Sequence, residues 1–99
     1  MMNVIIRRTN KAGKKLEAVI DGKTTVAFGA KGYEDFTIHK DEARKKLYIN
    51  RHAKNEDWTD PLTAGFWARW ILWNKPTLLD SIEDVNNRFK NLKVKWSNV

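Results

Sequence analysis

The stretch that organises this chain spans residues 28–73 and reads FGAKGYEDFTIHKDEARKKLYINRHAKNEDWTDPLTAGFWARWILW. It holds four of the five tryptophans and both histidines of the 99-residue sequence. Aromatic residues alternate in it with charged residues, and no pattern typical of a metal site or a catalytic nucleophile is present. Because aromatic side chains dominate the energetics of protein cores, the stretch predicts one packed structural unit rather than a catalytic site.

Three segments in the first 30 residues have a period of two: Val4 and Ile6 alternate with Ile5 and Arg7, Leu16, Ala18 and Ile20 alternate with Glu17, Val19 and Asp21, and Val26 and Phe28 alternate with Thr25 and Ala27. Alternation with a period of two is typical of half-buried strands. Asp21-Gly22 predicts a tight hairpin turn, in which both central residues need positive φ, and residues 10–13 predict a longer turn. Residues 1–30 therefore predict an antiparallel meander of three strands, whose apolar face other elements must cover.

The first helix is expected at residues 41–53. Asp41 is a suitable N-cap or first-turn acid, and cations gather at the other end, where they suit the helix dipole. The apolar stripe of this helix consists of Ala43, Leu47 and Tyr48.

Two further helices are expected after residue 59. Asp60 and Pro61 read as an N-cap and a first-turn proline, and aromatic and apolar residues then recur at helical spacing until Asn74-Lys75-Pro76. Thr77 and Asp80 resemble a capping box at the start of the last helix. One face of that helix carries Leu78, Ile82, Val85 and Phe89.

The tail alternates again, with Leu92, Val94 and Trp96 between polar residues. This pattern favours an added fourth strand over a tail that lies along a partner. The sequence contains no repeat or linker, so residues 1–99 predict a single domain: a meander at 1–30, a helical part at 31–91, and a tail or added strand at 92–99. The predicted fold class is α+β, a small antiparallel meander packed with three short α-helices.

The core is expected to contain Trp58, Phe66, Trp70 and Phe89 together with Leu47, Ile82 and Val85. Each aromatic ring buries about 150–250 Å², so five tryptophans in 99 residues exceed what so small a core can hide. We therefore expect some tryptophans at the surface, where Trp beside Arg and Lys is typical of interface hot spots and of base-stacking platforms.

Composition restricts the class of protein. The net charge is +7, from 19 Lys and Arg against 12 Asp and Glu, and such a surface attracts polyanions non-specifically. The absence of cysteine excludes disulfides and thiolate zinc sites. No apolar run is long enough to span a bilayer, and the N-terminal apolar stretch is too short for a signal peptide. We expect a protein that is neither secreted nor membrane-spanning.

Catalytic and metal sites are poorly supported. His39 and His52 need carboxylates such as Asp35, Asp41 or Glu56 to complete a metal site, and no metal-binding spacing is present, so a capping or hydrogen-bonded role is the default for both histidines. The acids Glu56, Asp57 and Asp60 are more typical of helix caps than of a magnesium site. We expect no enzyme activity, cofactor, metal or small-molecule substrate. Asp35 or Asp41 is expected to pair with Arg44 or Arg51.

A binding surface is predicted from basic and aromatic residues instead. Its members are Arg44, Lys45, Arg51 and Lys54 on the first helix, Trp67 and Arg69 on the aromatic helix, and Arg7, Lys14 and Lys15 on the first hairpin. Arg7 and Arg8 point to opposite faces of a strand, so only one of them can join a given patch.

Most of the chain fits the pattern FG-x-x-GY-x-DFT-x-HKD-x-x-RK-x-x-Y-x-x-RH, then E-x-W, then TAGFW-x-x-W-x-LWN-x-PT and a closing helix that ends in RF. The matching positions begin at Phe28 and end at Arg88 and Phe89, and include residues 35–37, 39–41, 63–67 and 72–74. In this pattern the chain resembles a small, poorly characterised family of proteins from large DNA viruses of eukaryotes and some tailed phages. The resemblance implies a viral context and no particular biochemistry.

Three functions are compatible with these features. The first is a minor virion component, a non-enzymatic binding protein that contacts viral structural proteins in the virion or the infected-cell cytoplasm. The second is a basic accessory protein that binds DNA or RNA. The third is a host-directed inhibitor. The sequence does not choose among the partners.

Overall fold

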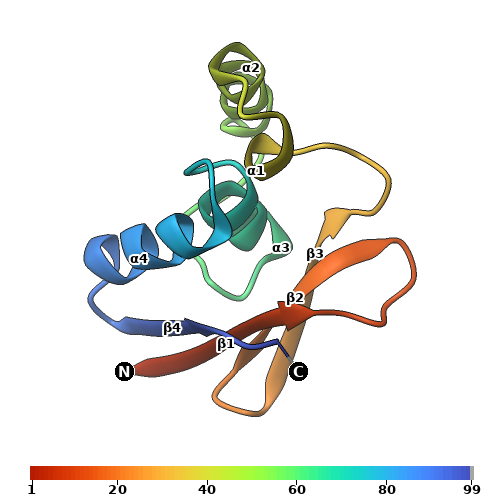
Figure 1. Ribbon diagram of the computed structural model, residues 1–99. Coiled ribbons are helices and arrows are strands. Elements are labelled where there is room, and N and C mark those ends of the chain that lie inside the picture. The colour runs from red at the N-terminus through yellow and green to blue at the C-terminus, as the bar shows by residue number, and fades with distance from the viewer. Residues whose placement is uncertain (99) are drawn as a thin grey trace.

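Four strands form one mixed sheet in the order β3-β2-β1-β4 (Figure 1). The structure is a computed structural model that describes residues 1–98. The strands are β1 (Met2–Arg8), β2 (Lys14–Ile20), β3 (Thr24–Ala30) and β4 (Leu92–Trp96). The first three form the predicted antiparallel meander. The tail adds the fourth strand, and it runs parallel to β1, with Val94 opposite Val4; the last residue of the predicted tail, Val99, lies outside the described residues.

Both hairpin turns follow the predicted chemistry. Asp21 and Gly22 have φ angles of 52° and 68°, the left-handed values that this type of turn requires. The register pairs Ile20 with Thr24, so the loop contains one residue more than a two-residue turn. Gly13 supplies the positive φ of the first turn, at 77°.

The helices lie between β3 and β4 in the chain: α1 (Phe36–His39), α2 (Glu42–His52), α3 (Ala64–Trp67), the π-helix η1 (Ala68–Leu72) and α4 (Leu78–Arg88). The N-caps predicted for α2 and α4 are confirmed, because Asp41 accepts from Ala43 N–H and Thr77 accepts from Asp80 N–H. Four-residue α1 was not predicted. Its N-cap is Asp35, whose carboxylate accepts from Thr37 N–H.

The predicted start of the aromatic helix was wrong. Asp60 accepts from Leu62 N–H, and its carbonyl accepts from the Thr63 hydroxyl. These bonds fold residues 60–63 into a turn, and Thr63 becomes the N-cap by accepting from Phe66 N–H. Asp60 and Thr63 both have short polar side chains that can cap, but the Asp60 carboxylate is used by Leu62 N–H within the turn, so Thr63 caps the helix.

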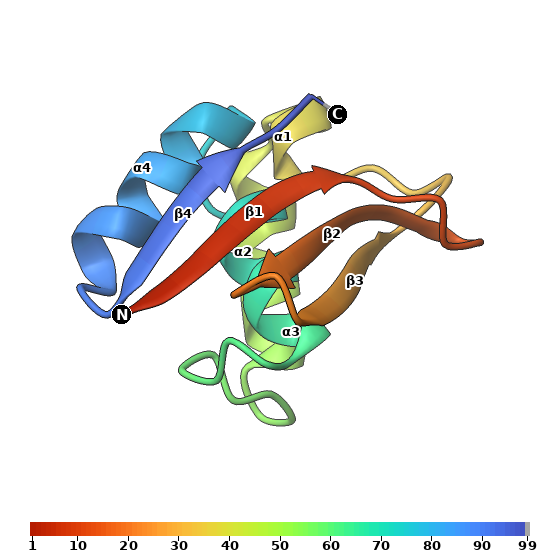
Figure 2. The same ribbon diagram turned by 90° about the horizontal axis from the view of Figure 1, so that it is seen from below.

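Helices α3, η1 and α4 cover one face of the sheet, as the two perpendicular views show (Figure 2). The inward side chains of the strands are buried there, among them Val4, Ile6 and Ala18 at 0% exposure. They pack in one cluster with Phe66, Trp67 and Ile71 from α3 and η1. The fold is therefore α+β, as the sequence predicts.

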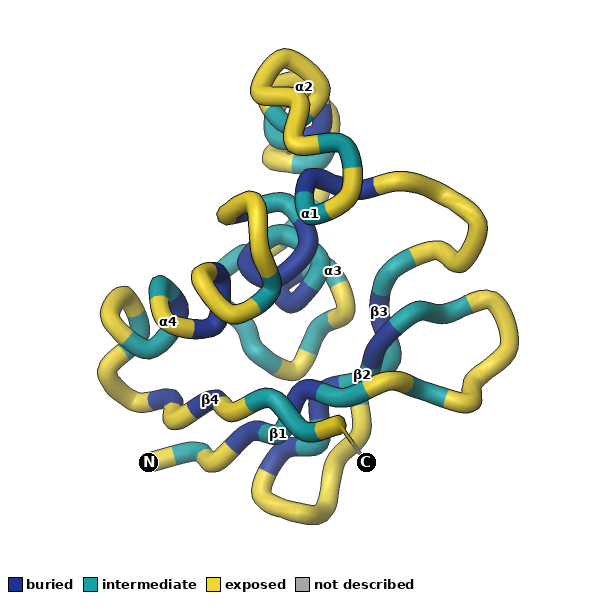
Figure 3. Tube along the Cα trace, viewed as in Figure 1, coloured by how far each residue is buried: buried dark blue, intermediate teal, exposed yellow. Residues whose placement is uncertain are grey.

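Helix α2 stands away from this core and is mostly exposed (Figure 3). Leu47 was predicted in the core, but it is 60% exposed, and Ala43 is exposed as well. Only Tyr48 of the predicted stripe is buried, because α2 presents a single edge to the rest of the protein. Of the other predicted core residues, Phe66, Trp70, Ile82 and Val85 are buried, whereas Trp58 and Phe89 are half-buried. Among the described residues, no helix has the length and apolar character needed to cross a membrane.

Candidate functional site

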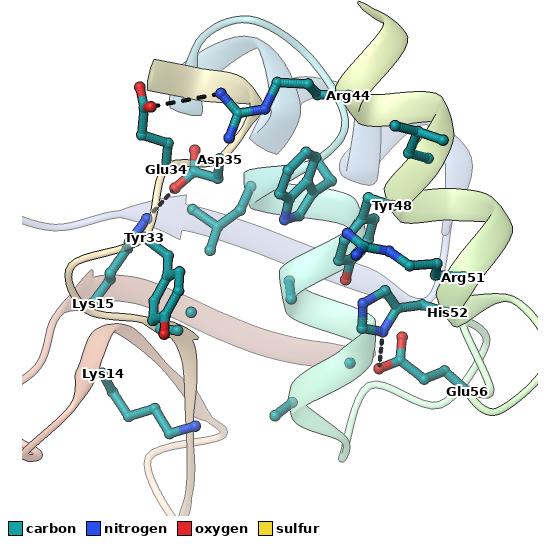
Figure 4. Close-up of a pocket in the computed structure, with 18 residues that line it drawn as sticks. Lys14, Lys15, Tyr33, Glu34, Asp35, Arg44, Tyr48, Arg51, His52 and Glu56 are labelled. Carbon is teal, nitrogen blue, oxygen red and sulfur yellow. Dashed lines mark hydrogen bonds and ion pairs between the residues drawn. The ribbon is translucent and has the colours of Figure 1, made fainter. Parts of the chain in front are cut away.

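A cleft of about 500 Å³ opens between the β2–β3 end of the sheet and helix α2. Lys14, Lys15 and Tyr33 line it on the sheet side, and Arg44, Arg51 and His52 line it from α2 (Figure 4). Small residues of α3 and η1, among them Gly65 and Ala68, lie at its base. The cleft thus brings together residues from the first hairpin and the first helix, which are about 30 positions apart in the sequence.

Two of the four Lys and Arg side chains on the cleft are paired. Lys15 Nζ lies 2.6 Å from Asp35 Oδ2, and Arg44 lies 3.5 Å from Glu34. Lys14 and Arg51 form no ion pair within residues 1–98. These two cations lie on opposite walls, and the Lys and Arg side chains of the lining outnumber its three carboxylates, Glu34, Asp35 and Glu56, by one.

The predicted pairing of Asp35 or Asp41 with Arg44 or Arg51 was wrong. Asp35 is 2% exposed and holds Lys15, while Asp41 accepts from the first N–H groups of α2. An acid at an N-cap satisfies backbone donors that would otherwise lack partners. This local demand ties both carboxylates to backbone N–H groups and leaves Arg51 free.

Stacked aromatic rings form part of the cleft wall. The Tyr48 ring lies between His52, at 4.3 Å between centroids, and Trp73, at 4.4 Å with an interplanar angle of 3°. Burial raises the pKa of the Tyr48 hydroxyl, and the charge of Glu56 adds to the effect, so this ring stays neutral. Tyr33, in contrast, is 74% exposed on the sheet side. It offers a free aromatic face at the mouth of the cleft.

Glu56 is held firmly at one end of the cleft. Its Oε2 accepts from Trp58 Nε1 at 2.8 Å, and its Oε1 lies 3.4 Å from His52 Nδ1. A Cβ at position 65 would approach the Glu56 carboxyl to 2.9 Å, so a larger residue there would shift this carboxylate from its present position. The cleft lining contains no serine, threonine or cysteine beside the His52–Glu56 pair. The His52–Glu56 pair therefore has no hydroxyl or thiol nucleophile of the serine, threonine or cysteine kind beside it in that lining.

The histidines occupy structural positions. His39 Nδ1 accepts from Asp41 N–H at 2.9 Å, and its ring contacts Trp73; His52 stacks on Tyr48. The hydrogen-bonded role predicted for His39 is confirmed. Within the described part of the chain, no group of three His, Cys, Asp or Glu side chains could hold a metal ion.

Two predicted binding residues, Lys45 and Arg69, are used inside the protein. Lys45 Nζ donates to Asn74 O at 2.7 Å and lies over the Phe36 ring. Arg69 donates to Trp73 O at 2.9 Å, and its guanidinium lies 4.3 Å from the Trp70 ring. Burial lowers the pKa of both side chains. Both cations satisfy carbonyl groups that follow η1, as cations commonly do at the C-terminal ends of helices.

The remaining predicted binding residues lie apart from the cleft. Trp67 is 0% exposed, and its Nε1 donates to Pro61 O, so its predicted place on a binding surface was wrong. Arg7 pairs with Glu17 on the face of the sheet away from the helices, and Lys54 is exposed but does not line the cleft. None of the five tryptophans is exposed: Trp67 and Trp70 are buried, and the other three are half-buried. Stacking and cation–π contacts cover the rings of Trp58, Trp70 and Trp73, so the tryptophans reach the surface only in part.

Sequence reasoning missed Tyr33 as a site residue. The available signal was its position next to Gly32, whose φ of 89° marks a turn that leaves β3. An aromatic residue in an exposed turn has no core to enter, so it is a candidate contact residue.

Residues 4–52 match the model of a family described as a family of unknown function (DUF5754). This matched segment contains Lys14, Tyr33 and Arg51, and therefore both walls of the cleft. No curated protein and no solved structure matches the chain.

Proposed function

We propose that this chain is a non-enzymatic binding domain that holds single-stranded nucleic acid in the cleft between β2 and α2. One observation carries the proposal: Lys14 and Arg51, from opposite walls, point toward one cleft without an ion pair among the described residues (Figure 4). Two free cations that face a common space suit a ligand with successive negative charges. A phosphate backbone is such a ligand.

The aromatic residues favour a single strand over a duplex. Bases of a single strand are unpaired and stack on aromatic side chains, which contributes about 1–3 kcal/mol per base. Tyr33 is exposed at the cleft mouth and can receive such a base. A duplex hides its base faces, so it would use the cations and gain nothing from Tyr33.

Fluorescence anisotropy with a labelled single-stranded oligonucleotide tests the proposal across a salt series. Each neutralised phosphate contributes a slope of about −0.7 in a plot of log affinity against log salt. We expect Lys14→Gln with Arg51→Gln to make the slope shallower by about 1.4. The matched control is Lys90→Gln with Lys93→Gln, which changes the net charge equally at exposed positions off the cleft.

If the two double variants lose the same affinity and the same salt dependence, the cleft has no special role and binding reflects only general attraction by the net charge.

Stacking is tested separately with Tyr33→Ala and Tyr33→Phe. We expect the alanine variant to weaken single-strand binding about 5- to 150-fold, and the phenylalanine variant to retain it, because the phenyl ring keeps the stacking face.

The viral context and the virion role stay predictions that rest on the resemblance described above, as does the host-directed inhibitor. Mass spectrometry of purified particles tests the virion role. A chain that is abundant in producing cells and absent from particles would exclude it and would leave the nucleic-acid proposal intact.

A further inference from the structure

Two aromatic rings of the cleft, one on each side, keep an open face. The aromatic side chains of the lining are Tyr33, Tyr48, His52 and Trp73. The Tyr48 ring is covered by His52 and by Trp73, and the Trp73 ring contacts Tyr48 and His39. Tyr48 and Trp73 are therefore closed to a ligand. Tyr33 contacts no other ring of the described residues, and His52 contacts only Tyr48.

His52 is fixed in position by its neighbours. Tyr48 stacks on one face of its ring, with 4.3 Å between centroids, and Glu56 Oε1 lies 3.4 Å from its Nδ1. The His52 side chain is nevertheless 42% exposed. It therefore presents a preoriented ring to the cleft, and a platform that is already ordered loses little conformational entropy when a ligand stacks on it.

An unpaired cation accompanies each of these two rings. Lys14 lies on the sheet side with Tyr33, and Arg51 directly precedes His52 on α2 (Figure 4). Neither cation forms an ion pair among residues 1–98. One nucleotide unit of a strand consists of a flat base with a phosphate on either side of it. Two rings and two cations on facing walls match this unit.

We propose that one base of the bound strand inserts between the rings of Tyr33 and His52. The phosphates on its two sides then face Lys14 and Arg51. His52 thereby becomes a second stacking residue, provided that the cleft binds single-stranded nucleic acid as proposed above. The volume of about 500 Å³ lies within the range of about 300–1,000 Å³ that is typical of pockets for small ligands, and the small side chain of Ala68 at the base of the cleft keeps this space open.

A short oligothymidylate with one central 2-aminopurine tests the proposal. The fluorescence of 2-aminopurine falls when the base stacks on aromatic rings, and it can be excited at wavelengths that tryptophan does not absorb. We expect marked quenching when the protein binds this oligonucleotide, with binding followed independently by anisotropy. Unchanged or increased fluorescence of the saturated complex would overturn the proposal, because a base outside the two rings is not quenched.

Two substitutions of His52 isolate the contribution of its ring. His52→Leu and His52→Phe both leave a side chain over Tyr48 and both remove the contact with Glu56, so they differ in whether a flat ring faces the cleft. We expect His52→Phe to retain quenching and affinity. His52→Leu should lose most of the quenching and at least about fivefold in affinity, the lower end of the range for stacking of one base. Equal behaviour of the two variants would overturn the role of His52.

The double variant Tyr33→Ala with His52→Leu shows whether both rings hold the same base. Loss of either ring should release the base from the cleft, so loss of the second ring should cost little more. The double variant should then lose less affinity than the product of the two single losses. Losses that multiply would mean that the two rings bind different bases, and the insertion of one base between them would be excluded.

Binding and quenching can fail separately. If the oligonucleotide binds with the expected dependence on Lys14 and Arg51 but 2-aminopurine is not quenched, the insertion of a base is excluded and the proposed function stands. If no oligonucleotide binds, both are excluded. An acidic tripeptide with a central tyrosine also places a flat ring between negative charges. Displacement of the oligonucleotide by an equal concentration of this peptide would assign the cleft to a protein partner and would overturn the proposal.

Discussion

Lys15 and Asp35 are joined by a 2.6 Å contact between the ammonium Nζ and the carboxylate Oδ2, although one lies in β2 and the other precedes α1. Asp35 is almost fully buried and also caps α1 through Thr37 N–H. A single carboxylate therefore fastens the loop after β3 to the sheet. It thereby positions the two preceding residues, Tyr33 and Glu34, at the mouth of the cleft.

Asp35→Ala is expected to lower the free energy of unfolding by about 3–5 kcal/mol, because it removes a cap and leaves Lys15 part-buried without its partner. Urea denaturation measures the change. Glu34→Ala is the control, since Glu34 is exposed and its pair with Arg44 should contribute at most about 1 kcal/mol. Equal effects of the two variants would show that the Lys15–Asp35 pair does not fasten the loop.

Trp67→Ala is expected to destabilise the fold by about 3–5 kcal/mol, since removal of a fully buried ring leaves a cavity. That loss is a large part of the stability of an ordinary domain. Thermal and urea unfolding check it, with Trp96→Ala at a half-buried edge position as the milder comparison. A stable Trp67→Ala protein with weakened ligand binding would restore Trp67 as a contact residue.

Glu56→Gln is expected to tighten binding of single-stranded oligonucleotides. The change removes a negative charge from the cleft, while the amide oxygen can still accept from Trp58 Nε1. The Glu56 carboxylate repels a phosphate a few ångströms away by about 1 kcal/mol. Removal of this repulsion should raise the affinity roughly fivefold. Glu83→Gln makes the same charge change on exposed α4, away from the cleft, and should gain much less.

Glu17 predicts an acid-sensitive component of stability. Hydrogen bonds from the Thr9 hydroxyl and from Arg7 lower the pKa of this carboxyl below its ordinary value of 4.5. A lowered pKa in the folded state contributes stability above the unfolded-state pKa, and this contribution is lost as the pH falls through the folded-state value. Glu17→Gln should therefore destabilise the protein at pH 7 and matter progressively less below about pH 4.5.

Urea titrations of the wild type and Glu17→Gln at a series of pH values measure this difference. If the unfolding free energies of the wild type and Glu17→Gln differ by the same amount at all pH values, including those well below 4.5, then Glu17 acts through packing and not through its charge.

The sequence by itself determined the features that depend on local geometry. Alternation located the first three strands, Asp21-Gly22 supplied the left-handed turn, and Asp41 and Thr77 began their helices. Each of these features is a property of a few neighbouring residues, so no distant part of the chain is needed to recognise it. The tail was recognisable as a strand for the same reason, although its alternation said nothing about direction.

Tertiary structure decided what those elements do to one another. The parallel pairing of β4 with β1 joins segments about 90 residues apart, and no local pattern encodes it. The fate of each cation was also decided at long range: Lys45 and Arg69 are drawn to the carbonyl groups after η1, while Lys14 and Arg51 meet at the cleft without partners. A charge in a sequence shows only its sign, and the folded position of the nearest oxygen atoms determines whether that charge remains free to bind.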